Sequence, residues 1–290
     1  MATVTGARRE ATGSMEAAET AAREGGAKKA APREIKGAWA LITGASSGIG
    51  AEIARNLAAH GANLVLTARR REALDALASE LRRTAVDVRV EPADLAKPGE
   101  PERLFQVLAS RGIRVSILVN NAGFGAYGPF DSIDAATEEA MLDLDIKALV
   151  RLTRLFVGPM RAEGFGRILL TASTGAYQPT PLYAAYSAAK AFVLSYGHAI
   201  RRELRGSGVT VTVLSPGVTR TEFHRVAGHE KNPFKTATMM EVAPVARAAT
   251  RALLGGKAEI VTGLLNRILV FSVRFVPRPV QAAMAARLMS

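Results

Sequence analysis

Residues 38–50 read Ala38-Trp-Ala-Leu-Ile-Thr-Gly44-Ala-Ser-Ser-Gly48-Ile-Gly50. The apolar run predicts a buried parallel strand, the glycines predict a turn, and residues 51–60 have the pattern of a helix. A second apolar run at 63–67 follows at the distance that a β-α-β unit requires. Gly44 permits the turn, Gly48 lets the main chain approach a pyrophosphate, and Gly50 allows the helix to pack closely on the strand. This pattern predicts a dinucleotide-binding unit with phosphates at a helix N-terminus.

The end of the second strand distinguishes between the two nicotinamide cofactors. An acidic residue there would hold the 2′-hydroxyl of NAD, but this chain has Thr67-Ala-Arg69-Arg70-Arg71 and no acid before Glu72. A guanidinium is a better partner for a 2′-phosphate. We therefore expect NADP(H), with Arg69 as the main phosphate ligand. The alternative for Arg70 and Arg71 is that they simply begin the next helix in solvent.

Apolar and amphipathic segments alternate along the rest of the chain. Further strands are expected at 88–92, 116–119, 167–173, 209–214 and 259–262, and helices at 71–83, 138–163 and 183–205. With 290 residues and 48% hydrophobic composition, the chain can bury one substantial core. The expected fold class is α/β, a Rossmann-type doubly wound parallel sheet of about seven strands with helices on both faces.

A tyrosine and a lysine share one helix face in the run Tyr186-Ser-Ala-Ala-Lys190. Two unit charges ~4 Å apart at an effective dielectric constant of ~20 interact by about 4 kcal/mol. That energy would bring the pKa of a phenol from ~10 to the neutral range. Ser173, at the end of an expected strand, would add a hydroxyl at the sheet edge. The three side chains predict a proton-transfer site; a core tyrosine beside a solvated lysine is the alternative for the pair alone.

Taken together, the motifs resemble the short-chain dehydrogenase/reductase family over about residues 36–263. They are Gly44-x3-Gly48-x-Gly50, Asn120-Asn-Ala-Gly123, Ser173, Tyr186-x3-Lys190 and Pro216-Gly217, in the order and spacing of that family. The resemblance implies hydride transfer between NADP(H) and a carbonyl or secondary alcohol. Tyr186 would be the general acid/base and Ser173 would hold the carbonyl oxygen. Lys190 would bind the nicotinamide ribose and lower the pKa of Tyr186.

The resemblance also implies which residues bind the cofactor. They are Gly44, Ser46, Ser47, Gly48, Ile49, Gly50, Arg69, Asp94, Leu95, Asn121, Ala122, Gly123, Tyr186, Lys190, Pro216, Gly217 and Thr219. Asp94 would lie beside the adenine and Asn121 beside the ribose. For Asp94, an N-cap of a helix that begins at Leu95 is the alternative, which does not exclude the cofactor role. No metal-binding residues are expected.

Asp145 departs from the pattern, since the family usually has a catalytic asparagine at this position. In the family that asparagine helps to hold a water that links the lysine to solvent. A carboxylate here would add a negative charge near Lys190, which would raise the pKa of Tyr186. We expect Asp145 to be part of the site and activity to be retained with an altered pH profile.

The two ends of the chain differ from the expected catalytic domain at 36–263. Residues 1–35 have no sustained apolar stripe and no secretory signal, so we expect a disordered tail and a cytoplasmic protein. Residues 264–290 are too often interrupted to span a bilayer. Their apolar side chains with Arg267, Arg274, Arg278 and Arg287 suit an interfacial helix and peripheral membrane contact. The alternative is a tail packed on the core or on another subunit.

The net charge and the apolar residues restrict the classes of partner and substrate that we expect. The net charge of +12 is not accompanied by a nucleic-acid motif, so no nucleic acid is expected, and the absence of cysteine excludes disulfides. The resemblance implies a homo-oligomer. An apolar substrate pocket is expected from the loop 218–240, with Phe223, Phe234, Met239 and Met240, and from Phe124, Tyr127 and Tyr177. This lining favours a lipophilic ketone, aldehyde or secondary alcohol. A catalytically silent dinucleotide-binding scaffold or cofactor sensor, and a membrane-peripheral reductase of lipid ketones, are the alternatives.

Overall fold

The structure is a computed structural model that describes residues 35–223, 227–228 and 239–289. The tail expected at 1–35 therefore lies almost entirely outside the described residues, as does Phe234 of the expected substrate loop. No helix among the residues described is long and apolar enough to cross a membrane.

A seven-stranded parallel sheet forms the centre of the fold, in the order β3-β2-β1-β4-β5-β6-β7. Its strands are β1 (Trp39–Thr43), β2 (Asn63–Thr67), β3 (Val88–Val90), β4 (Val115–Asn120), β5 (Gly166–Thr171), β6 (Val209–Ser215) and β7 (Glu259–Val261). Leu41 of β1 pairs with Val65 of β2 on one side and Leu118 of β4 on the other. Strand order reverses between β1 and β4, and this is where open α/β sheets bind ligands at the carboxyl ends of their strands. The predicted fold class is confirmed.

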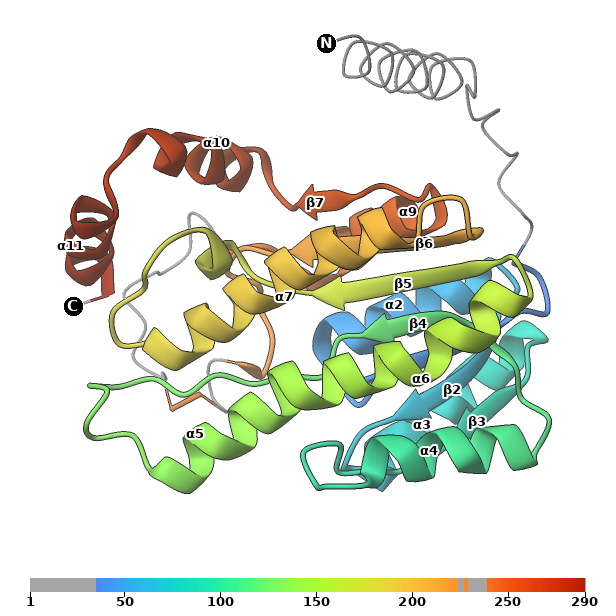
Figure 1. Cartoon of the computed structure of the whole chain (residues 1–290). Helices are drawn as coiled ribbons and strands as arrows, with labels where there is room; N and C mark the ends of the chain where they lie inside the picture. Colours follow the sequence, from blue (N-terminus) through green and yellow to red (C-terminus); the bar gives the residue numbers. More distant parts are fainter. Residues whose placement is uncertain (1–34, 224–226, 229–238, 290) are drawn as a thin grey trace, which may run out of the picture. The chain divides into compact units, whose positions relative to one another are not determined.

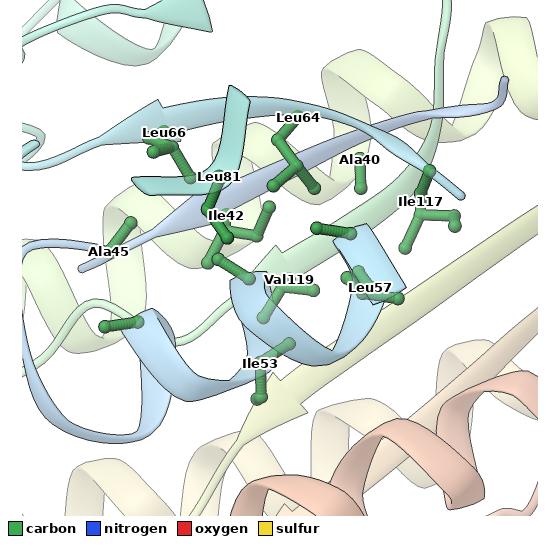
Figure 2. Packing of buried hydrophobic residues seen from close by; sticks show 14 of the residues in the cluster. Ala40, Ile42, Ala45, Ile53, Leu57, Leu64, Leu66, Leu81, Ile117 and Val119 are labelled. Carbon is green, nitrogen blue, oxygen red and sulfur yellow. The ribbon is translucent and has the colours of Figure 1, made fainter. Parts of the chain in front are cut away.

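Helices cover both faces of the sheet (Figure 1). One face carries α2 (Gly48–Ala59), α3 (Arg71–Leu81) and α9 (Val242–Leu254), and the other carries α4 (Glu100–Ser110), α6 (Leu149–Ala162) and α7 (Ala184–Glu203). Figure 2 shows Ile53 and Leu57 of α2 packed on side chains of β1, β2 and β4. Because both faces are covered, the central strands are apolar on both sides: Leu41 and Ile42 point to opposite faces and are each fully buried.

The helix expected at 138–163 is interrupted. It is composed of α5 (Ala135–Leu142), a π-helical segment (Asp143–Ala148) and α6. The Asp134 side chain caps α5 by accepting a hydrogen bond from Thr137 N at 2.9 Å. A π-helical turn accommodates one extra residue and often lies at a functional site. Here it contains Asp145, whose side chain is completely buried.

Two other boundaries differ from expectation. The strand expected at 88–92 ends at Val90. The alternative role for Asp94 was that of N-cap of a helix beginning at Leu95. No helix begins there, so that alternative is wrong. Lys97 N donates to Asp94 O in a turn, and α4 begins only at Glu100. Pro98 explains the delay, since the residue before a proline is disfavoured in helical conformation.

Two further helices follow β7, α10 (Leu264–Ser272) and α11 (Arg278–Met289), with a short 3-10 turn at Val273–Phe275 between them. They are the red elements of Figure 1. Gln281 Nε2 donates to Val273 O at 2.7 Å and to Val276 O at 2.6 Å, which ties α11 to the turn before it. The expected amphipathic extension is therefore helical.

Candidate active site

A cavity of about 1100 Å³ lies at the carboxyl ends of the strands. It is lined by almost every residue that the sequence singled out: Gly44, Ser46, Ser47, Gly48, Ile49, Arg69, Asp94, Leu95, Asn121, Ala122, Gly123, Ser173, Tyr186, Lys190, Pro216, Gly217 and Thr219. Gly50 and Asp145 lie behind this wall. The structure thus brings the expected site residues together from the loops that follow six strands, β1 to β6, and from α2 and α7.

Close packing explains two of the glycines in the turn after β1. Gly44 has φ +66°, and a Cβ there would lie 2.9 Å from Ala122 Cα. A Cβ on Gly50 would lie 2.4 Å from Gly44 O and 2.6 Å from Asn121 Nδ2. Asn121 Nδ2 in turn donates to Thr43 O at 3.1 Å, which fixes the loop after β4 beside the turn. The glycines therefore let α2 begin directly against the strand, with its N-terminal N–H groups facing the cavity.

Arg70 has a role in this turn that the sequence did not reveal. Its guanidinium donates to Ser46 Oγ at 3.2 Å and Ser47 Oγ at 3.0 Å, and pairs with Glu222 Oε2 at 2.7 Å. Arg71 does follow the alternative expectation, because it pairs with Asp75 on the exposed side of α3. Arg69 and Arg70 both line the cavity. The turn therefore presents two guanidiniums, two hydroxyls and a helix N-terminus, a donor set that fits a phosphate-rich dinucleotide such as NADP(H).

Lys190 and Asp145 form a buried ion pair. Lys190 Nζ lies 2.9 Å from Asp145 Oδ2 and donates to Thr171 O at 3.2 Å. Asp145 Oδ1 accepts a hydrogen bond from Phe124 N at 3.2 Å. Burial raises the pKa of Asp145, while the neighbouring Lys190 ammonium acts in the opposite direction. From the sequence, the Lys190 ammonium was expected to act on Tyr186. In the structure it also interacts with the Asp145 carboxylate.

Tyr186 lies beside this pair. Lys190 Nζ is 5.6 Å from the centre of the Tyr186 ring. Burial raises the pKa of Tyr186, the Asp145 carboxylate raises it further, and a hydrogen bond with Ser173 acts against both. A raised pKa of Tyr186 is the effect that the sequence predicted for a carboxylate at position 145. The predicted lowering of the Tyr186 pKa by Lys190 is not found in the structure, because the ammonium is paired with Asp145.

Ser173 lies two residues beyond β5 rather than within the strand. It precedes a 3-10 turn at Thr174–Tyr177, and its Oγ accepts a hydrogen bond from Gly175 N at 3.1 Å. The same hydroxyl interacts with Tyr186. Two polar side chains are therefore directed at one point of the cavity wall, where a carbonyl oxygen could accept hydrogen bonds from both.

The other end of the cavity is apolar. Phe124, Tyr177 and Phe223 line it as expected, and the Phe223 ring lies 5.2 Å from that of Tyr186. Tyr127 instead contacts Tyr183, with the ring centres 5.2 Å apart and the rings tilted by 52°. Neither Tyr127 nor the two methionines of the loop, Met239 and Met240, are among the lining residues.

The sequence did not predict that the C-terminal helices complete this apolar wall. The residues that they contribute are Leu265, Asn266, Leu269, Val270, Val273 and Ala285. The Pro216-Gly217 loop passes against α10 so closely that a Cβ on Gly217 would lie 2.1 Å from Asn266 Nδ2. The spacing of Leu265, Leu269 and Val273, four residues apart, was the available signal for one helix face.

Comparison with known proteins agrees with this geometry. Residues 38–232 match the family described as short chain dehydrogenase. Human 17-beta-hydroxysteroid dehydrogenase type 3 is 37% identical over 188 residues, which are 64% of this chain and 60% of that protein. Very-long-chain 3-oxoacyl-CoA reductase of Anas platyrhynchos is 32% identical over 209 residues, 70% of this chain and 66% of that protein. The chain thus spans about three fifths of the length of the first curated relatives that it matches.

A solved structure gives the same result. The short-chain dehydrogenase from Sphingobium yanoikuyae in complex with NADPH superposes with a TM-score of 0.73 at 33% identity, covering 82% of this chain and 93% of that one.

Proposed function

Since the chain belongs to the short-chain dehydrogenase/reductase family, we propose that it is an NADP(H)-dependent oxidoreductase that interconverts a lipophilic carbonyl compound and its secondary alcohol. The observation that carries the proposal is the meeting of Ser173, Tyr186 and Lys190 in one cavity with the glycine turn and Arg70. A binding protein would need the turn but not the proton-donating phenol.

Each residue has a defined task in the reduction. Tyr186 donates its proton to the carbonyl oxygen, and Ser173 holds the same oxygen through its hydroxyl. NADP(H), when bound, supplies the hydride. Lys190 holds the ribose hydroxyls, and Asp145 keeps the ammonium oriented through its ion pair. Because the pKa of Tyr186 is raised, the phenol carries its proton at neutral pH, which is the protonation state that reduction requires.

The preference for NADP(H) rests on charge. Arg69 and Arg70 line the cavity where β2 ends, and no acidic residue occupies that position. Two guanidiniums attract a 2′-phosphate, whereas an acid would accept the 2′-hydroxyl of NAD. The related protein from Sphingobium yanoikuyae, whose structure contains NADPH, supports the same choice.

The substrate class follows from the cavity walls. Beyond Tyr186 the wall combines aromatic and aliphatic side chains from the loops after β4 and β5 and from α10 with a few polar ones, Gln178, Thr180 and Asn266. Such a surface binds an extended apolar body by burial and leaves a single carbonyl for the polar pair. The names of two relatives, a hydroxysteroid dehydrogenase and a very-long-chain 3-oxoacyl-CoA reductase, refer to substrates of this kind.

Two observations bear on the remaining alternatives. The Lys190 ammonium is paired with Asp145 and so acts less on Tyr186, which favours a catalytically silent dinucleotide-binding scaffold as the second candidate.

A homo-oligomer is consistent with Phe192 and Tyr196 of α7, whose rings stack at 5.7 Å and leave Phe192 40% exposed. Sedimentation of wild type and Phe192→Ser would test that interface: a wild-type oligomer that dissociates in the variant supports it.

Cofactor titration separates the enzyme from the scaffold. Nicotinamide fluorescence should show tighter binding of NADPH than of NADH. Tyr186→Phe should still bind NADPH, yet reduce apolar ketones at least about 100-fold more slowly. Unchanged turnover in this variant would exclude Tyr186 as the acid. Binding of NADPH without reduction of any ketone by the wild-type protein would favour the scaffold.

A further inference from the structure

The outer surface of the C-terminal helices has no partner within the described part of the chain. We propose that α10, the turn at 273–275 and α11 form a docking surface for an anionic lipid bilayer, and that the cavity receives its apolar substrate through this surface. The second half of this proposal rests on the proposed function, whereas docking does not. We refer to residues 264–287 as the C-terminal helix pair.

α10 and the 3-10 turn that follows it are apolar on two faces. One face, with Leu265, Leu269 and Val273 at intervals of four residues, lines the cavity. The other carries four apolar side chains that are mostly in solvent: Leu264 (72% exposed), Ile268 (56%), Phe271 (57%) and Phe275 (75%). At 100° per residue, Leu264, Ile268 and Phe271 of α10 fall within one narrow stripe. A helix that only covered the cavity would need the first face but not the second.

The exposed apolar residues of the described chain are concentrated here. Val280 and Met284 of α11 are also exposed, at 48% and 55%. Elsewhere in the part of the chain that is described, the exposed large apolar side chains are Phe130 and Phe192. An apolar surface gathered on two short helices is typical of a binding surface rather than of scattered surface residues.

Charge identifies the partner. Residues 264–290 contain Arg267, Arg274, Arg278 and Arg287 and no aspartate or glutamate. The Arg274 guanidinium lies 5.7 Å above the Phe271 ring, which itself contacts the Phe275 ring at 5.4 Å. In a bilayer interface the aromatic rings enter the acyl boundary while the guanidiniums remain at the phosphates. Anionic headgroups supply the charge that the segment lacks.

The same charges argue against a second copy of the chain as the partner. A two-fold interface sets the same patch against itself, so the arginines of one helix pair would face those of the other. No acid within 264–290 would compensate them. Like charges brought together at a desolvated interface oppose association.

The docking surface and the cavity share residues. Leu265 and Leu269 line the cavity and are each still 51% exposed. Ala285 of α11 lines the cavity from the other helix and is 2% exposed. A molecule that leaves the acyl region between α10 and α11 would therefore pass from one apolar surface to the next without entering water, which removes the cost of transferring its apolar area through the solvent.

Vesicle flotation tests docking directly. The full-length protein should float with vesicles of phosphatidylcholine and phosphatidylglycerol and bind much more weakly to phosphatidylcholine alone. A triple variant, Ile268→Ser, Phe271→Ser and Phe275→Ser, changes residues outside the cavity lining and should reduce binding at least about tenfold. The matched control Phe130→Ser removes an exposed aromatic side chain elsewhere and should bind as wild type does. Equal binding by the triple variant and wild type would overturn the proposal.

Two further measurements separate the possible outcomes. Sedimentation without lipid shows whether the triple variant only dissociates an oligomer; a change in oligomer with unchanged vesicle binding would make a second copy the partner. Tyr186→Phe should bind vesicles normally, so docking can be confirmed even if the proposed activity fails.

Substrate entry is tested with two ketones. The triple variant should raise KM at least about tenfold for an apolar ketone presented in vesicles and leave the KM for a small water-soluble ketone unchanged. An equal change for both ketones would exclude entry through the membrane.

Discussion

Lys190 Nζ lies 2.9 Å from Asp145 Oδ2, and the two side chains are 5% and 0% exposed. The π-helical segment after α5 carries the carboxylate, and α7 carries the ammonium. Removal of either charge would leave the other buried without its partner, which is costly. The pair therefore acts as a unit beside Tyr186, and the pH dependence of the site should follow from it.

The first prediction concerns Asp145→Asn. Loss of the carboxylate removes a charge that raises the pKa of Tyr186 and leaves the Lys190 charge uncompensated, and both effects lower that pKa. Alcohol oxidation requires the deprotonated phenol, so its pH-rate profile should shift toward lower pH by about one unit. The measurement is kcat/KM against pH. A variant with the rate and the pH profile of wild type would show that Asp145 does not influence the phenol.

The second prediction concerns Arg70. Arg70→Ala should weaken NADPH binding roughly tenfold and leave NADH binding nearly unchanged, because only NADPH carries the phosphate that needs the guanidinium. Arg71→Ala is the matched control: Arg71 is the next residue, but its side chain pairs with Asp75 outside the cavity. Equal losses of NADPH and NADH affinity in Arg70→Ala would instead indicate that Arg70 only supports the turn.

The third prediction follows from the partner of Arg70. Glu222 Oε2 lies 2.7 Å from the guanidinium and would compete with a bound phosphate for it. Glu222→Gln removes the negative charge, and we expect NADPH to bind about threefold more tightly because the pair is solvent-exposed and hence weak. Fluorescence titration would measure the change. Weaker binding of NADPH would mean that Glu222 positions Arg70 rather than competing for it.

The sequence was sufficient for the central part of the fold. The run at 38–50 predicted a strand, a turn and a helix, and they form β1 and α2 because Gly44 and Gly50 permit contacts that a Cβ would prevent. Ser173 follows a buried strand, and Tyr186 and Lys190 lie on α7. The parallel strands therefore bring these three residues together at the carboxyl-terminal edge of the sheet.

Other features depend on contacts between distant segments and could not be predicted. Arg70 meets Glu222 across 152 positions, and nothing in the local run distinguishes it from Arg69. The π-helical segment around Asp145 has an ordinary helical pattern in sequence. The C-terminal helices were expected to be amphipathic, but only the structure shows that one face of α10 completes the cavity.

The last prediction uses two glycines in helices. In Gly50→Ala the new Cβ would meet Gly44 O at 2.4 Å, a main-chain atom that cannot move without displacing the turn. We expect a loss of about 2 kcal/mol in the free energy of unfolding, a Tm lower by about 5 °C, and weaker NADPH binding. Gly158→Ala is the control, because a Cβ on Gly158 of α6 would have no neighbour within 4 Å. It should gain about 0.5 kcal/mol from helix propensity. If both variants changed Tm alike, backbone propensity rather than close packing would explain Gly50.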